Sequence, residues 1–140
     1  MKINRDDLNN MEQRYRAMFI NCLSGYKSAN LIGTVDKGGQ TNLAIMSSTF
    51  HLGASPPLVG LVVRPDAADR HTLDNIRATG VYTINHVSVD IVKQAHQTSA
   101  RYPKEVSEFD AVGLTADFKS EFSAPFVKES VISMGLEFEL

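Results

Sequence analysis

The sequence predicts a mainly β fold with short helices, whose strands close into a barrel or a strongly curled sheet. Residues 26–50 resemble two strands around a turn, and residues 58–63 form a continuous apolar run. Residues 81–87 and the end of 131–140 alternate between apolar and polar positions, the period of a half-buried strand. A hairpin makes at least part of the sheet antiparallel, and closure removes unpaired edges.

Length and composition fit one domain. The chain has 140 residues, 43% of them hydrophobic and 21% charged, which is close to the globular average. Its formal net charge of -2 provides no broad attraction to nucleic acid or to anionic lipid. We therefore expect a single domain over residues 1–140, with neither a nucleic-acid partner nor a membrane partner.

Cysteine content and the N-terminal residues indicate a cytoplasmic protein. Cys22 is the single cysteine and cannot form an intramolecular disulfide; we expect it to have a small, buried apolar role. A Cys/His cluster at zinc spacing is absent from the sequence, so no metal site is predicted. Residues 1–7 are too polar for a signal peptide, and no apolar run approaches the roughly 20 residues that span a bilayer. These features predict a soluble, cytoplasmic protein.

The first half of the chain predicts a helix followed by a hairpin. Apolar positions at three- and four-residue spacing predict a helix over 8–18. Strands are expected over 26–35 and 41–50, joined by the turn at 36–39. The prolines within 53–57 should then break the ladder, because proline lacks an amide donor.

The middle of the chain alternates strands with short helices. The run 58–63 should be a strand buried on both faces and ended by Arg64-Pro65. Thr72 can cap a helix over 73–79 that stops at Gly80, and 81–87 follows as a strand.

The last part of the chain predicts one more helix, a long loop and a final strand. Ser88 can cap a helix over 89–99 with Val89, Val92 and Ala95 on its apolar face. Residues 101–125 are the most loop-like, with one short helix near Val106, and 131–140 predicts a half-buried strand.

One group of residues has the composition of an anion site. Arg64, Arg70, His71 and Thr72 lead into the predicted helix, whose first amides have no partner within the helix. Arginine adds a forked, charge-assisted donor set that suits a phosphate monoester. The alternative from composition alone is that Thr72 only caps the helix and that both arginines are solvated surface charges.

A second group lies where the strand over 41–50 changes from apolar to polar. Ser47, Ser48 and Thr49 offer hydroxyls and backbone amides that suit the hydrogen-bonding rim of a flat heterocycle. The alternative is an exposed strand end.

The order and spacing of five sequence blocks resemble the flavin-reductase-like, FMN-binding split-barrel family. The blocks are Asn42-Leu43-Ala44-Ile45-Met46-Ser47-Ser48, Pro56-Pro57-Leu58, Arg64-Pro65, Arg70-His71-Thr72 with Asn75-Ile76, and Tyr82-Thr83-Ile84-Asn85-His86. The resemblance implies a split β-barrel that binds FMN, with NADH or NADPH as electron donor, and a homodimer. It also implies that Ser47, Ser48 and Thr49 face the flavin ring and that Arg64, Arg70, His71 and Thr72 serve the ribityl phosphate.

The resemblance leaves catalytic residues unassigned, because in such proteins the flavin ring does the redox chemistry and no catalytic side chain is required. The expected activity is an NAD(P)H-dependent flavin oxidoreductase. A flavin-binding electron carrier without its own substrate site is the alternative; a pyridoxamine-phosphate-oxidase-like or haem-binding barrel lacks support in the sequence. Domains of this family usually continue with further strands, so we expect this chain to lack the last ones.

The remaining candidates predict no chemistry. His51, His86 and His96 lack metal spacing with carboxylates and are expected to face solvent or to be satisfied by hydrogen bonds. Glu137 and Glu139 fit the wet face of a strand.

Overall fold

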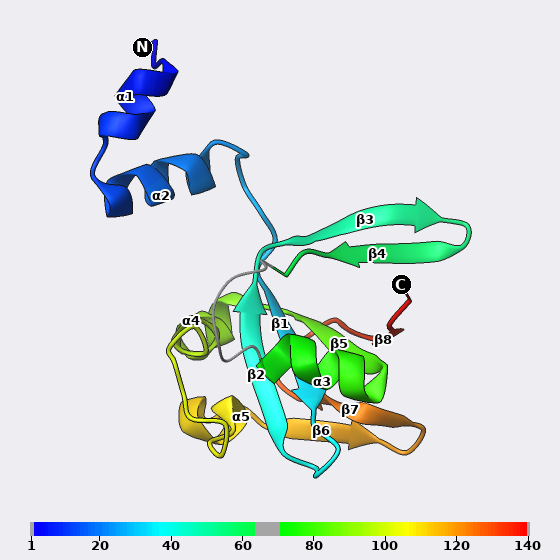
Figure 1. Ribbon diagram of the computed structural model, residues 1–140. Coiled ribbons are helices and arrows are strands. Elements are labelled where there is room, and N and C mark those ends of the chain that lie inside the picture. Colours follow the sequence, from blue (N-terminus) through cyan, green and yellow to red (C-terminus); the bar gives the residue numbers. More distant parts are fainter. Residues whose placement is uncertain (1, 64–70, 140) are drawn as a thin grey trace.

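The computed structural model describes residues 2–63 and 71–139, so Arg64 and Arg70 lie outside the described residues. Figure 1 shows a β-rich body from which two parts project: the N-terminal helices and the hairpin β3–β4. Among the described residues, no helix has the length and apolar character needed to cross a membrane. In chain order the elements are α1 (Arg5–Asn10), α2 (Gln13–Cys22), β1 (Asn30–Val35), β2 (Thr41–Met46), β3 (Thr49–Ala54), β4 (Pro57–Leu61), α3 (His71–Thr79), β5 (Val81–His86), the 3₁₀ turn η1 (Val89–Ile91), α4 (Val92–Gln97), α5 (Glu108–Val112), β6 (Ala116–Lys119), β7 (Phe122–Val127) and β8 (Ser133–Glu137).

The centre of the body is a four-stranded sheet in the order β2-β1-β5-β8, with each neighbouring pair antiparallel. The hairpin β6–β7 lies against this sheet, and β3–β4 forms a separate two-stranded ribbon (Figure 1). A mainly β fold with short helices was expected from the alternating strands, and this expectation is confirmed.

Side chains of β5 hold β7 onto the sheet. Asn85 Nδ2 donates to Leu31 O at 3.0 Å, and Val127 N donates to Asn85 Oδ1 at 3.0 Å. Thr83 Oγ1 donates to Pro125 O at 2.6 Å. The approach is so close that a Cβ added to Gly33 would meet Pro125 O at 2.3 Å and Thr83 Oγ1 at 2.4 Å. Buried backbone groups require hydrogen-bond partners, and the side chains of β5 supply them here. These contacts hold β7 against the sheet and so close the barrel on this side.

Apolar side chains fill the two faces of the sheet. The smaller cluster lies under α3 and contains Ile32, Ile76, Tyr82 and Ile84. The larger cluster lies under α4, α5 and β7 and contains Leu31, Leu43, Ile91, Ala95, Phe109, Leu114 and Val127.

Two helices replace the single helix predicted over 8–18. Asn4 caps α1 through a capping box with Asp7, and the carboxylate of Glu12 accepts hydrogen bonds from the amides of Arg14 and Tyr15 to begin α2. These local caps divide the segment, which periodicity alone did not indicate. Neither helix contains a buried residue, and Cys22 is exposed, so the prediction of a buried cysteine was wrong.

The chain from 26 to 63 forms strands at other places than predicted. β1 begins only at Asn30, and the expected strand over 41–50 ends at Met46 before β3 begins at Thr49. Residues 53–57 do not break the ladder, because Ala54 pairs with Pro57 across a turn whose Ser55-Pro56 bond is cis. β4 is only partly buried, so the prediction of burial on both faces was wrong.

The two predicted helix caps are also corrected. Thr72 lies inside α3, which begins at His71, and it is buried instead of capping the helix. Ser88 makes no side-chain cap bond, and Val89 and Val92 are exposed while Ile91 and Ala95 are buried. The predicted stop at Gly80 is confirmed by its φ of 77°, which glycine adopts at low cost.

Residues 101–125 hold more structure than expected. The short helix lies at α5 instead of near Val106, and β6 with most of β7 falls in the segment predicted to be a loop. The strands predicted over 81–87 and within 131–140 are confirmed as β5 and β8.

Candidate flavin site

The site begins with the outer edge of β2, because β2 is an edge strand of the central sheet. Leu43 N donates to Glu108 Oε2 at 2.9 Å, and Ile45 N donates to Thr98 Oγ1 at 3.0 Å. These bonds satisfy edge amides that would otherwise be open to another chain. They also fix the segment between α4 and α5 beside β2.

A cavity of about 240 Å³ lies between β2, the start of α3 and this segment. Alternation along β2 turns Asn42, Ala44 and Met46 toward the cavity, while Leu43 joins the core on the other face. The other lining residues are Val63, His71, Thr72, Leu73, Thr98, Ala100, Arg101, Tyr102 and Glu108.

Four polar side chains that line the cavity are more than nine-tenths buried: Asn42, Thr72, Thr98 and Glu108. Asn42 Nδ2 donates to Thr72 Oγ1 at 3.0 Å. Glu108 and Thr98 accept hydrogen bonds from amides of β2, so the buried polar groups of this floor have partners within the chain, as buried polar groups require.

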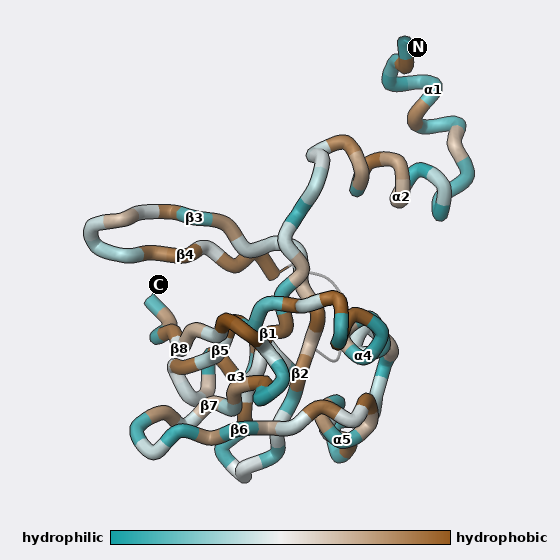
Figure 2. Tube along the Cα trace, turned by 180° about the vertical axis from the view of Figure 1, so that it is seen from behind, coloured by the Kyte–Doolittle hydropathy of each residue, from teal (hydrophilic) through white to brown (hydrophobic). Residues whose placement is uncertain are grey.

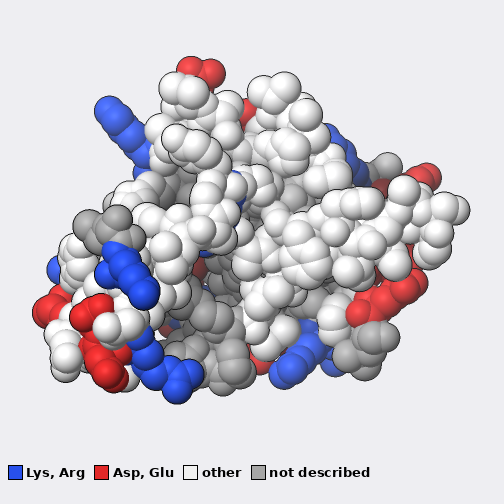
Figure 3. All heavy atoms as spheres, turned by 90° about the horizontal axis from the view of Figure 1, so that it is seen from above, with Lys and Arg blue, Asp and Glu red and all other residues white. Residues whose placement is uncertain are grey.

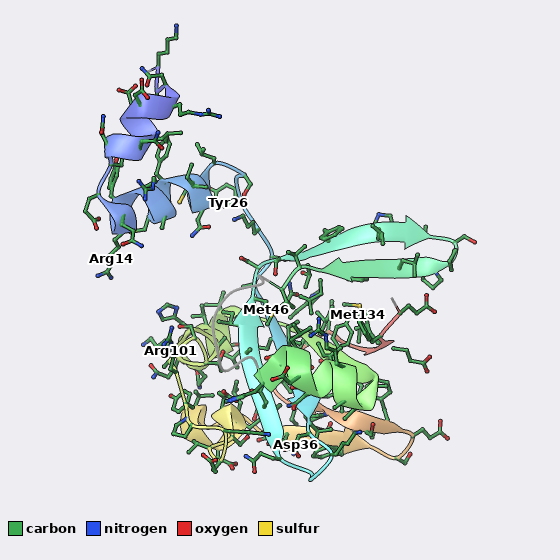
Figure 4. All side chains as sticks on the ribbon, in the orientation of Figure 1. Arg14, Tyr26, Asp36, Met46, Arg101 and Met134 are labelled. Carbon is green, nitrogen blue, oxygen red and sulfur yellow. The ribbon has the colours of Figure 1, made fainter. Side chains whose placement is uncertain are left out.

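The cavity combines charged and apolar walls. Arg101 is exposed at the rim, and His71 lies at the first position of α3. Figure 4 shows Arg101 on the segment after α4 and Met46 at the end of β2. Ala44, Met46 and Leu73 supply the apolar wall. The donor set therefore suits a ligand with an anionic group and an apolar body.

The sequence-predicted residues fall into three sets. His71 and Thr72 line the cavity, whereas Arg64 and Arg70 lie outside the described residues. Ser47, Ser48 and Thr49 follow β2 beyond the cavity lining.

The serine and threonine hydroxyls hold the base of the hairpin β3–β4. Ser48 Oγ donates to Val62 O at 2.7 Å, and Thr49 Oγ1 accepts a hydrogen bond from Asn30 Nδ2 at 2.7 Å. Ser47 is exposed. Among the described residues, the side chain of Ser47 therefore makes no hydrogen bond to the base of the hairpin, unlike those of Ser48 and Thr49.

Among the lining residues, sequence reasoning named only His71 and Thr72 as site residues, and those it missed include Thr98, Arg101, Tyr102 and Glu108. They lie at the end of a predicted helix and in the predicted loop, far along the chain from β2. A weak signal existed, because an Arg-Tyr pair directly after a helix can serve an anionic or aromatic ligand.

A larger groove adjoins the cavity. It has a volume of about 970 Å³ and runs between the hairpin β3–β4, α3 and β8. Val63 and Leu73 line both spaces. We call this larger space the hairpin groove. Tyr82 lies on its floor, where burial raises the pKa of the phenol.

The surface above these spaces carries few charges. Seen from above, Lys, Arg, Asp and Glu side chains stand mainly around the rim, and the extended part at the right is mostly uncharged (Figure 3). Within residues 2–63 and 71–139, no three or more His, Cys, Asp or Glu side chains come together that could hold a metal ion.

The curled sheet, the projecting hairpin and the polar-apolar cavity define a split-barrel protein. Residues 23–139 match the Flavin reductase like domain family, and the chain belongs to that family.

Solved structures share the fold. A flavin-reductase candidate with a split-barrel domain from Shewanella frigidimarina NCIMB 400 is 57% identical, with a TM-score of 0.93 over 98% of this chain and 68% of its own. Nitrilotriacetate monooxygenase component B from Bacillus cereus is 24% identical, with a TM-score of 0.85 over 100% of this chain and 68% of its own. At that identity the likeness shows the fold alone.

A curated relative from Aquifex aeolicus, whose function is unassigned, is 30% identical over 104 residues, or 73% of this chain. The chain spans 53% of that relative's length.

Proposed function

We propose that this chain binds FMN as part of an oxidoreductase that uses NADH or NADPH to reduce flavin. The observation that carries the proposal is the cavity beside β2, whose lining includes Asn42, Ala44, Met46, His71 and Thr72 from the sequence blocks that resemble the family. FMN joins a dianionic phosphate to an apolar tricycle with a hydrogen-bonding rim, so the residues present fit it in kind.

The phosphate end is assigned to the start of α3. A helix N-terminus directs unpaired amides at an anion, and Arg64, Arg70 and His71 would add charged donors. The hydroxyl of Thr72 accepts a hydrogen bond from Asn42 and would donate its own hydrogen to the phosphate. Arg101 extends this donor set from the opposite wall of the cavity.

The ring end is assigned to the end of β2. Ala44 and Met46 offer an apolar wall. Ser47 and Ser48, which follow β2, and Thr49, which begins β3, would offer backbone amides and hydroxyls to the ring. When bound, the flavin supplies the redox chemistry by accepting a hydride and passing electrons to an acceptor. The chain's own residues bind it, orient it and limit access of water to it.

A homodimer is part of this proposal. The cavity of about 240 Å³ is below the roughly 300 to 1,000 Å³ of typical ligand pockets, so it encloses only a part of FMN. A second copy that covers the ring end would complete the enclosure.

The test is steady-state oxidation of NADH and NADPH by the purified chain with added FMN. The proposal expects turnover with at least one donor and a flavin absorption spectrum after gel filtration. A bound flavin without NAD(P)H oxidation would favour the electron-carrier alternative, and no flavin binding at all would overturn the proposal.

A matched set of arginine variants locates the phosphate. Arg70→Ala and Arg101→Ala should each weaken FMN binding roughly tenfold or more, because a charge-assisted hydrogen bond is worth about 1.5 to 3 kcal/mol. Arg77→Ala is the control, since Arg77 is exposed in the last turn of α3 and does not line the cavity. Equal effects of all three substitutions would remove the assignment.

A further inference from the structure

The N-terminal arm, residues 2–29, has an apolar face that the other described residues of the chain leave exposed. Tyr15, Met18, Phe19 and Cys22 are at helical spacing along one side of α2, and Tyr15 and Met18 are 60% and 61% exposed. Figures 1 and 2 show the arm standing away from the body, with apolar residues along α2.

An isolated arm of this kind is not stable by itself. Helices shorter than about 12 to 15 residues are marginal in water, and α2 has 10. Packing against something outside the protomer would supply the stability that the arm lacks.

The hairpin groove has the complementary character. It is lined mainly by apolar side chains such as Leu58, Leu61 and Met134. The formal charges among its described lining residues are those of Glu137 and Glu139. α2 in contrast carries Arg14 and Arg16 and no acid. Arg16 donates to Leu8 O and Asn9 O at the end of α1, whereas Arg14 flanks the apolar face (Figure 4).

We propose that α2 of each protomer docks into the hairpin groove of a second copy of this chain, with Arg14 facing the partner's Glu137 and Glu139. Such an exchange is isologous, because each copy gives one arm and receives one. The inference rests on the homodimer proposed above and names the surface that forms it. Since Val63 and Leu73 line both spaces, the docked arm would border the flavin cavity.

Charge-swapped proteins test the exchange between chains. Arg14→Glu alone places like charges together at both contacts of its homodimer, and Glu137→Lys/Glu139→Lys does the same from the groove side. An equimolar mixture of the two proteins pairs opposite charges at both contacts. In low salt, sedimentation and native mass spectrometry should show each protein dimerising several-fold more weakly than wild type and the mixture forming a heterodimer. Unchanged dimers of the separate proteins, or a mixture without heterodimer enrichment, would overturn the proposal.

An apolar variant tests the same contact without relying on charge. Met18→Glu should weaken the dimer at least tenfold, because a methionine buried at each of two contacts is replaced by a carboxylate. Met18 is not packed within its own chain, so folding should be kept. Val89→Glu is the control, since Val89 is 88% exposed and lies in neither surface. Equal dimerisation of the two variants would contradict the docking.

Failure of this inference is distinguishable from failure of the flavin proposal. Docking is measured as a dimer dissociation constant, and flavin binding as the absorption of wild-type protein. The wild-type protein could bind flavin while the Arg14→Glu, Glu137→Lys/Glu139→Lys and Met18→Glu proteins keep the wild-type dimer dissociation constant. That result would contradict only the docking.

Discussion

The barrel body and its two projecting parts, the N-terminal arm and the hairpin β3–β4, differ in which side chains are buried. In the body, Asn85 and Thr83 lie at zero exposure and every bond they make stays within the chain. In the arm and the hairpin, Met18, Leu23 and Leu52 are each more than 60% exposed. It follows that buried polar groups inside the body are satisfied by its own residues, whereas the two projections expose apolar surface that suits a partner.

The largest effect is expected inside the body, at Asn85. Asn85→Ala removes the acceptor of Val127 N and the donor to Leu31 O, and it leaves a small cavity. We expect a loss of about 3 to 5 kcal/mol of unfolding free energy, because orphaned buried groups cost about 1 to 3 kcal/mol each. Urea unfolding measures it. Val89→Ala, at an exposed site, should change stability by less than about 0.5 kcal/mol; similar losses at both sites would contradict the comparison.

A smaller loss is expected where β7 meets β1. Gly33→Ala inserts a methyl group against Pro125 O and Thr83 Oγ1, and the strands must move apart. Overpacking of this kind costs about 1 to 3 kcal/mol. Gly38→Ala is the matched control in an exposed turn, where the atoms nearest to the added Cβ belong to the side chain of Asp36. Equal melting temperatures of the two variants in thermal unfolding would show that β7 is not closely packed against β1.

A third prediction concerns the bond that holds the cavity wall to β2. Thr98→Val keeps the shape of the side chain but removes the acceptor of Ile45 N. We expect a loss of about 1 to 2 kcal/mol of unfolding free energy. FMN should also bind more weakly, because the wall that contains Arg101 loses its fixed position. Ser99→Ala is the control, because the Ser99 hydroxyl bonds only to His96 O at the surface. FMN affinity unchanged in Thr98→Val would argue against this wall as part of the site.

The smallest effect belongs to the arm and depends on pH. Hydrogen bonds from the amides of Arg14 and Tyr15 hold the pKa of the Glu12 carboxyl below its usual value of 4.5. The lowered pKa means that the cap stabilises α2 above that value and loses its effect as pH falls through the folded-state pKa. An NMR titration should find the Glu12 carboxyl titrating below 4.5, with α2 loosening in the same pH range. Glu12→Gln should abolish that pH dependence, and a pKa at or above 4.5 would disprove the cap.

Much of the body could be predicted because its signals are local. The strands β5 and β8 follow from alternating side chains, and Gly80 marks the end of α3 by its own conformation. The segment 101–125 was predicted as a loop because Pro103, Gly113 and Pro125 interrupt it. In the structure, contacts with distant strands keep β7 in place despite Pro125, and short-range patterns do not contain those contacts.

The candidate site divides in the same way. His71 and Thr72 were predicted from neighbouring residues and from the family resemblance, and both line the cavity. Arg101 and Glu108 were missed because their positions depend on long-range hydrogen bonds. Amides of β2 donate these bonds to Thr98 and Glu108, which lie more than fifty positions later in the chain. Within the arm, one helix was predicted over 8–18, because apolar periodicity does not detect the caps at Asn4 and Glu12 that begin two separate helices.

The start of α3 and the opposite wall of the cavity, which contains Arg101, are proposed to hold the phosphate of FMN. Calorimetric titration of the full chain with FMN and with riboflavin tests this assignment most directly, because the two ligands differ only in that phosphate. The account predicts that FMN binds at least tenfold more tightly, as expected for one or more charge-assisted hydrogen bonds of about 1.5 to 3 kcal/mol. Equal affinities for FMN and riboflavin would contradict it.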